Sequence, residues 1–243
     1  VLVAPIPDIE VPQIVVRPET PVTPETPEVP FEVQAGPKGS QIGLVRKYVD
    51  TLPIASSQTP IYITQPAGQL TVNGWNRNMV VATLEVEVVA STHEAEKVFV
   101  SKAALRIAIE KNGYYIEAVF PKLTDPQTKV VNATMVLSVP QRNPIICDNS
   151  FGSVTATNIG ADLMIKGRYS TISATEIGGN LRIENSMRPI SLSNIFGTID
   201  VLNSNAPVSL SSCEGDITIR NQSGVINVVN SKGDLSLVNS GSI

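Results

Sequence analysis

Between Ile145 and Leu235, one hydrophobic position recurs every nine residues without interruption. This first column consists of Ile145, Val154, Leu163, Ile172, Leu181, Ile190, Ile199, Val208, Ile217, Ile226 and Leu235. A second column follows two residues later, at Cys147, Ala156, Ile165, Ala174, Ile183, Leu192, Val201, Leu210, Ile219, Val228 and Leu237. Residues i and i+2 lie on one face of a strand, so each unit predicts a short strand with two inward side chains.

A second signal doubles this period to 18 residues. Hydrophobic residues at 159, 177, 195 and 213 alternate with polar ones at 150, 168, 186, 204 and 222. The pattern therefore predicts that residues 141–243 form a right-handed parallel β-solenoid with 18-residue coils, the hand following that of parallel crossovers. A hexapeptide solenoid would need a period of six, and a calcium-binding roll would need Gly-Gly-x-Gly-x-Asp turns that are absent here.

Asparagines also recur every 18 residues, at Asn185, Asn203, Asn221 and Asn239. Asn149 belongs to the same series, in which Gly167 takes the position between Asn149 and Asn185. We expect their amides to hydrogen-bond to one another up the stack, because identical side chains on successive coils lie directly above each other.

Residues 40–140 predict a β-rich region with short helices. Hydrophobic residues spaced three or four apart from Ser40 to Leu52 predict a helix that ends before Pro53. Ser91 and Glu94 form a capping-box pattern that predicts the start of a second helix. Alternating stretches at 80–90, 105–109, 114–120 and 131–139 predict strands, and Asn112-Gly113 predicts a tight hairpin through positive φ angles.

Residues 1–39 predict a Pro-rich extended linker. Prolines recur at every third position from Pro18 to Pro30, which places them on one edge of a polyproline II rod. This stalk serves as a spacer, and recognition by a proline-binding module is the alternative.

Composition excludes several classes of partner. The net charge is −4, whereas nucleic-acid-binding domains usually have a pI above about 9, so we expect no nucleic-acid partner. No hydrophobic run reaches the roughly 18 residues that span a bilayer. The chain begins at Val1 without Met, which suggests a signal or membrane-anchor segment upstream. Cys147 and Cys213 are the only cysteines, and their positions several coils apart predict two unpaired, inward-facing thiols.

The chain resembles the bacterial putative-adhesin family, which consists of β-solenoid proteins of the cell envelope with largely unknown function. The resemblance rests on Gly68-Gln-Leu-Thr-Val-Asn-Gly-Trp-Asn-Arg77, His93-Glu-Ala-Glu-Lys97, Val136-Leu-Ser-Val-Pro140 and the Gly-x-Ile-x-Ile coils. It covers roughly residues 68–243 and implies a secreted or envelope protein, periplasmic or at the cell surface. It implies no catalytic residues.

We find no catalytic constellation, no metal site and no cofactor motif in the sequence. His93 is the only histidine, which excludes histidine-based triads and metal sites, and we expect it to be exposed in a first helical turn. Asp216 and Asp234, 18 residues apart, form the best carboxylate pair, because adjacent coils lie about 4.8 Å apart and retaining glycosidases need about 5–5.5 Å. Both follow a turn glycine and should be exposed.

The two outward faces of the solenoid differ in chemistry. One is an uncharged hydroxyl face made of Thr155, Thr157, Ser173, Thr175, Ser191, Ser193, Ser209 and Ser211. The other carries Asp148, Lys166, Glu184 and Arg220 in one column, beside Arg182 and Asp200, with signs that favour cross-strand pairing. The hydroxyl face is either a solvated sheet or a flat surface that binds a glycan or a protein.

These observations favour a non-enzymatic adhesin or scaffold of the cell envelope. The alternative is a polysaccharide-degrading β-solenoid enzyme that uses surface carboxylates, which would require a deep cleft over Asp216 and Asp234. The last coil would leave Leu235 and Leu237 uncovered, so we also expect a homodimer through the C-terminal coil.

Overall fold

The computed structural model describes residues 43–122 and 128–240. The chain divides into two units, 1–34 and 35–243, and the second contains all described residues. It is all-β, with sixteen strands in one large sheet system and, within the described ranges, one helix. The predicted Pro-rich linker of residues 1–39 lies outside the described residues.

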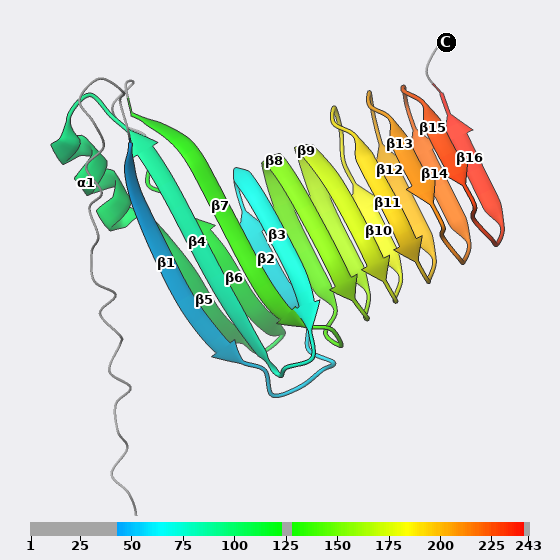
Figure 1. The fold of residues 1–243 in the computed structure, drawn as a ribbon, viewed down its shortest axis with the longest axis horizontal. Coiled ribbons are helices and arrows are strands. Elements are labelled where there is room, and N and C mark those ends of the chain that lie inside the picture. The colour runs from blue at the N-terminus through cyan, green and yellow to red at the C-terminus, as the bar shows by residue number, and fades with distance from the viewer. Residues whose placement is uncertain (1–42, 123–127, 241–243) are drawn as a thin grey trace, which may run out of the picture. The chain divides into compact units, whose positions relative to one another are not determined.

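The first part of this unit forms two branches of strands (Figure 1). Its strands are β1 (Leu44–Pro53), β2 (Ile61–Gln65), β3 (Gly68–Trp75), β4 (Met79–Val89), β5 (Ala104–Glu110), β6 (Gly113–Val119) and β7 (Lys129–Pro140). One branch runs β1-β4-β7-β3, and the other runs β5-β6-β2. Both branches end on β8 (Ile145–Ile159), whose first half pairs in parallel with β2 and whose second half pairs in parallel with β3.

From β8 onward the strands stack side by side in parallel, as Figure 1 shows in yellow-green to red. They are β9 (Leu163–Ile177), β10 (Leu181–Glu184), β11 (Ile190–Ile195), β12 (Ile199–Asn203), β13 (Val208–Ser211), β14 (Ile217–Asn221), β15 (Ile226–Val229) and β16 (Leu235–Asn239). The register joins residues 18 apart, as in Ile183 with Val201 on one side and Leu192 with Leu210 on the other. Two strand paths, β10-β12-β14-β16 and β11-β13-β15, therefore enclose one core.

The core is formed by the two periodic columns. The first nine members of each column are at most 2% exposed, whereas Leu235 and Leu237 are 51% and 44% exposed. The same core continues into the first part of the unit, where alternate residues of β4 from Val80 to Val88 are fully buried. The nine-residue period thus identifies the inward positions from β8 onward, and the alternation of hydrophobic residues identifies those of β4.

One corner of the stack is built on left-handed backbone. Asn158, Glu176, Asn194, Ser212 and Asn230 are 18 residues apart, and all have φ between 52° and 59°. Asparagine tolerates this conformation better than other residues that carry a Cβ atom. Glu176 and Ser212 adopt it at the positions that correspond to these asparagines 18 residues away.

The asparagine ladder differs from our expectation. Asn185 and Asn221 each donate through Nδ2 to the carbonyl three residues later and to the carbonyl fifteen residues earlier, in the preceding turn. The amides therefore bond to turn carbonyls rather than to one another, and the buried Oδ1 atoms of Asn185, Asn203 and Asn221 have no partner among the described residues. The prediction of amide-to-amide bonding was wrong because the turns present their carbonyl groups to the same positions.

The gap at Gly167 has a structural reason. A Cβ atom at this position would collide with Oδ1 of Asn185. The hydroxyl of the buried Ser170 donates to Oδ1 of Asn149 at 2.7 Å, so the side-chain oxygen of Asn149 has a hydrogen-bond partner.

The helix predicted from Ser40 to Leu52 is wrong, since residues 44–53 form strand β1. Its spacing suited a helix, but antiparallel pairing with β4 places Val45 and Val49 outward, 43% and 48% exposed. Leu44 and Leu52 point into the core, as alternate residues of a strand do. Long-range pairing decides such short hydrophobic segments.

The second predicted helix is present as α1 (His93–Lys102), with a different cap. Thr92, rather than Ser91, accepts from the amide of Ala95, and Glu96, rather than Glu94, accepts from the amide of Ala90. The hairpin between β5 and β6 is confirmed, with Glu110 paired to Gly113. Asn112 and Gly113 do not have the positive φ angles that we expected.

Candidate binding face

The eight residues of the predicted hydroxyl face lie in two adjacent rows across four strands. On β11, Ser191 pairs with Ser173 and Ser209, and Ser193 pairs with Thr175 and Ser211. On β8, Thr155 and Thr157 pair in turn with Ser173 and Thr175 of β9. The rows arise because successive outward residues alternate with the buried columns.

The rows extend further than the sequence predicts. On β3, Thr71 pairs with Thr155 and Asn73 with Thr157, and Oγ1 of Thr157 donates to Oδ1 of Asn73 at 2.8 Å. Beyond β3, Ser138 of β7 pairs with Asn73. No nine-residue period connects residues 71 and 155, so only strand pairing reveals this extension. The alternation of polar Thr71 and Asn73 with buried Leu70 and Val72 was the one available signal.

This extended hydroxyl face carries no charged side chain in its two rows from β7 to β15. The rows are Val136, Thr71, Thr155, Ser173, Ser191, Ser209 and Asn227, and Ser138, Asn73, Thr157, Thr175, Ser193, Ser211 and Val229. A shallow hollow of about 280 Å³ lies over it, lined by the serines of β9, β11 and β13 and by Asn227 and Val229. Apart from the Thr175–Ser193 contact at 3.0 Å, these serines have no side-chain partner among residues 43–122 and 128–240. Their hydroxyls can therefore both donate to and accept from a ligand.

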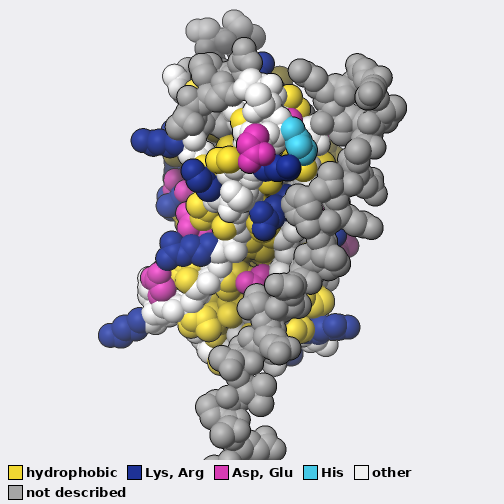
Figure 2. Space-filling view, turned by 90° about the vertical axis from the view of Figure 1, so that its left-hand side faces the viewer, with side chains coloured by type: hydrophobic (Ala, Val, Ile, Leu, Met, Phe, Trp, Pro, Cys, Tyr) yellow, Lys and Arg dark blue, Asp and Glu magenta, His cyan; other side chains and the backbone are white. Residues whose placement is uncertain are grey.

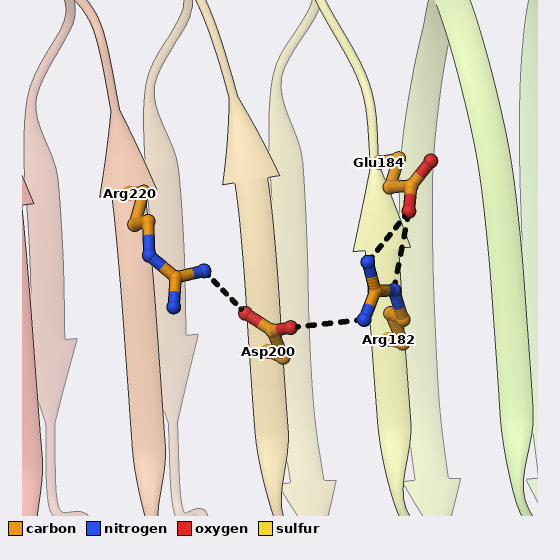
Figure 3. A network of polar contacts seen from close by, with 4 residues as sticks. All are labelled: Arg182, Glu184, Asp200 and Arg220. Atoms are coloured by element: carbon orange, nitrogen blue, oxygen red, sulfur yellow. Dashed lines mark hydrogen bonds and ion pairs between the residues drawn. The ribbon is translucent and has the colours of Figure 1, made fainter.

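On the opposite face, four of the six charged residues pair with one another (Figure 3). Asp148 and Lys166 form no ion pair with any residue that the structure describes, so the expected pairing holds only for part of the column. Arg182 bonds to Glu184 at 2.9 Å and approaches Asp200 at 3.5 Å. Arg220 of the next coil bonds to the other oxygen of Asp200 at 3.1 Å. Such exposed pairs contribute about 0–1 kcal/mol each, and they leave little unbalanced charge for a ligand.

The candidate carboxylates lie on an exposed part of the surface. Asp216 and Asp234 are both exposed, and an oxygen of Asp216 accepts from the backbone amide of Asp234 at 3.3 Å. Neither residue lines the three hollows described in this structure. Within residues 43–122 and 128–240, no group of three His, Cys, Asp or Glu side chains is placed to hold a metal ion.

The only histidine and the two cysteines make contacts that support the fold rather than a reaction. His93 is 56% exposed at the start of α1 and contacts Glu96 at 2.9 Å, as its predicted position requires. Cys147 and Cys213 are free and buried, which confirms the prediction of unpaired thiols. Burial, together with the neighbouring Asp148 carboxylate, raises the pKa of Cys147 to about 12. Neither thiol is poised as a nucleophile.

The end of the sheet that carries β1 and α1 has a mixed surface. Figure 2 shows Lys and Arg side chains interspersed with Asp and Glu on this side, with hydrophobic side chains between them. The helix in the described part of the chain is too short and too polar to cross a membrane.

Comparison with known proteins gives structural neighbours only. No protein-family model and no curated protein matches the sequence. A putative cell adhesion protein from Clostridium sporogenes is 10% identical with a TM-score of 0.49, covering 77% of this chain and 100% of that one. Putative adhesins from Parabacteroides distasonis and Bacteroides fragilis are 9% and 8% identical, with TM-scores of 0.35 and 0.32, and cover 79% and 80% of this chain and 97% of each of theirs. These neighbours have the adhesin names that the resemblance predicts, but TM-scores below 0.5 carry no argument about function.

Proposed function

We propose that this protein is a non-enzymatic adhesin or scaffold of the cell envelope that binds a neutral glycan on its extended hydroxyl face. In this proposal, residues 141–243 form a right-handed parallel β-solenoid with 18-residue coils. Residues 1–39 form the Pro-rich stalk that carries it. Pairing between residues 18 apart supports the coil length, and the general hand of parallel crossovers supports the handedness.

The observation that carries this proposal is the uncharged surface that continues from β7 to β15. A polar, uncharged array spaced by about 4.8 Å per strand offers repeated donors and acceptors to an extended polymer of sugar hydroxyls. An anionic or cationic ligand would find no counter-charge there. A neutral polysaccharide therefore fits this face better than a charged polymer.

The location and partners follow from the same proposal. An envelope adhesin needs an attachment to the cell. The exposed side chains of Leu235 and Leu237 support self-association at the C-terminal coil. The enzyme alternative has less support, because Asp216 and Asp234 lie outside any described hollow.

Binding of the purified protein to an array of neutral and charged glycans tests the proposal. We expect retention on neutral polymers that varies little with salt, because no ion pair would form. Ser209→Arg should weaken binding at least about tenfold, a loss of about 1.4 kcal/mol, because the long side chain at this exposed position would cover the flat surface that the polymer contacts. Leu202→Arg is the matched control, because Leu202 is 50% exposed on the charged face.

Two outcomes would contradict this function. A blank array combined with adhesion to deglycosylated cells would identify a protein ligand instead. Glycan binding that Ser209→Arg leaves unchanged would place the binding site on another surface.

A further inference from the structure

A second hollow, of about 260 Å³, lies where two loops meet at one end of the sheet. It is lined by Trp75, the last residue of β3, by Arg77 of the β3–β4 loop, and by Arg142 and Asn143 of the β7–β8 loop. The amide of Gln141 donates to the carbonyl of Trp75 at 3.1 Å, which joins the two loops. This hollow, the Trp75 pocket, contains the only tryptophan in the chain.

The walls of the Trp75 pocket are held by hydrogen bonds. Nε1 of Trp75 donates to the carbonyl of Met79 at 2.7 Å, which fixes the indole ring. Nδ2 of Asn143 donates to the carbonyls of Ser56 and Thr59 at 2.7 and 2.8 Å, which fixes a third segment. Asn143 is 1% exposed, so the pocket has a rigid, buried polar side chain in its lining.

The pocket has an excess of positive charge. Arg77 and Arg142 line it, and no carboxylate does. Arg77 lies over the Trp75 ring at 5.0 Å from its centroid, which orients its guanidinium. Unlike Arg182 and Arg220, neither arginine forms an ion pair with any residue in the described parts of the chain.

Asn143 also offers an unused acceptor. Its Oδ1 atom is buried and receives no hydrogen bond from the described residues. A buried amide oxygen without a donor is destabilising unless another group supplies one.

We propose that the Trp75 pocket binds a single acidic sugar residue, a uronate. Its carboxylate would accept from Arg77 and Arg142, and its ring would pack beside Trp75. The volume falls below the roughly 300 Å³ at which pockets for drug-sized ligands begin, which suits one sugar ring. The site is independent of the hydroxyl face, which has no charge to hold a carboxylate.

Fluorescence tests this proposal directly, because Trp75 is the only tryptophan. Titration with sodium glucuronate at constant ionic strength should give a saturable change with a Kd of about 1 mM, an affinity in the weak range for one small ligand. Glucose and sodium sulfate should bind at least about tenfold more weakly, because glucose lacks the carboxylate and sulfate lacks the sugar ring. Saturation-transfer NMR of the glucuronate protons provides a second readout that does not use the indole.

Variants separate the pocket from general charge effects. Arg142→Gln should weaken glucuronate binding at least about tenfold and leave the melting curve unchanged. Arg168→Gln, which removes an exposed arginine from a corner of β9, should leave binding unchanged. The proposal is wrong if the signal stays linear to about 50 mM, far above the expected Kd, if glucose or sulfate binds as well, or if both variants bind alike.

Discussion

Replacing Ile183 with Asp tests the assignment of inward and outward positions. Ile183 lies on β10 and is 1% exposed. Its neighbours in register are Ile165 on β9 and Val201 on β12, both fully buried. An aspartate at this position would therefore lie between two hydrophobic side chains, with no cation or donor in either column.

The expected loss is large compared with the stability of a domain. Removing a buried isoleucine costs about 2–3 kcal/mol of hydrophobic stabilisation, and burying an unpaired carboxylate costs several kcal/mol more. The sum approaches the roughly 5–15 kcal/mol that stabilises a whole domain. Ile183→Val, which removes one methylene, should cost only about 1 kcal/mol.

Urea denaturation followed by circular dichroism measures these differences. Ile183→Asp should be unfolded or strongly destabilised near neutral pH. Ser191→Asp, in the same coil but exposed on the hydroxyl face, should change the free energy of unfolding by less than about 0.5 kcal/mol. Equal losses in the two aspartate variants would show that the rows have been assigned to the wrong faces.

Three further predictions concern the left-handed backbone at Glu176, the buried thiol of Cys147, and the exposed Leu235 and Leu237 near the end of the stack. Glu176→Gly should raise the free energy of unfolding by up to about 1 kcal/mol, because glycine adopts a φ of 58° without steric cost; a loss in chemical denaturation would contradict this. Stability should fall as pH rises from 9.0 towards about 12, because the unfolded chain loses the Cys147 proton first. Cys147→Ala should flatten that decline, and an unchanged pH profile would refute the cause. Light scattering should detect a dimer that Leu235→Lys with Leu237→Lys abolishes, and a monomeric wild type at high concentration would exclude it.

The sequence predicted the buried positions between Ile145 and Ile219 well, because the same short strand pattern repeats along this part of the chain. Ile183 and Ile219 could be placed in the core from their spacing alone. The first part of the unit was harder to predict, since β1 forms through its pairing with β4 and not through its own pattern of hydrophobic residues. The same physical reason hid the contribution of Asn73 to the hydroxyl face, because its partner Thr157 lies 84 residues away.

The Trp75 pocket was beyond sequence analysis for a related reason. Its arginines lie in separate loops, and neither the period nor a motif connects Arg77 with Arg142. The asparagine network was predicted in position but not in bonding, because the spacing of Asn203 and Asn221 shows only which side chains are stacked. The orientation of the turn carbonyls decides which atoms meet.

The constant register has a consequence for how this surface can change in length. From β10 to β14, each strand pairs only with the strands formed 18 residues before and after it. An in-frame duplication of one 18-residue segment would therefore insert a complete new layer whose inward residues match both neighbours. Each such event would lengthen the hydroxyl rows by about 4.8 Å and leave the Trp75 pocket intact. Gene duplication would thus change the length of this face without redesigning either end of the stack.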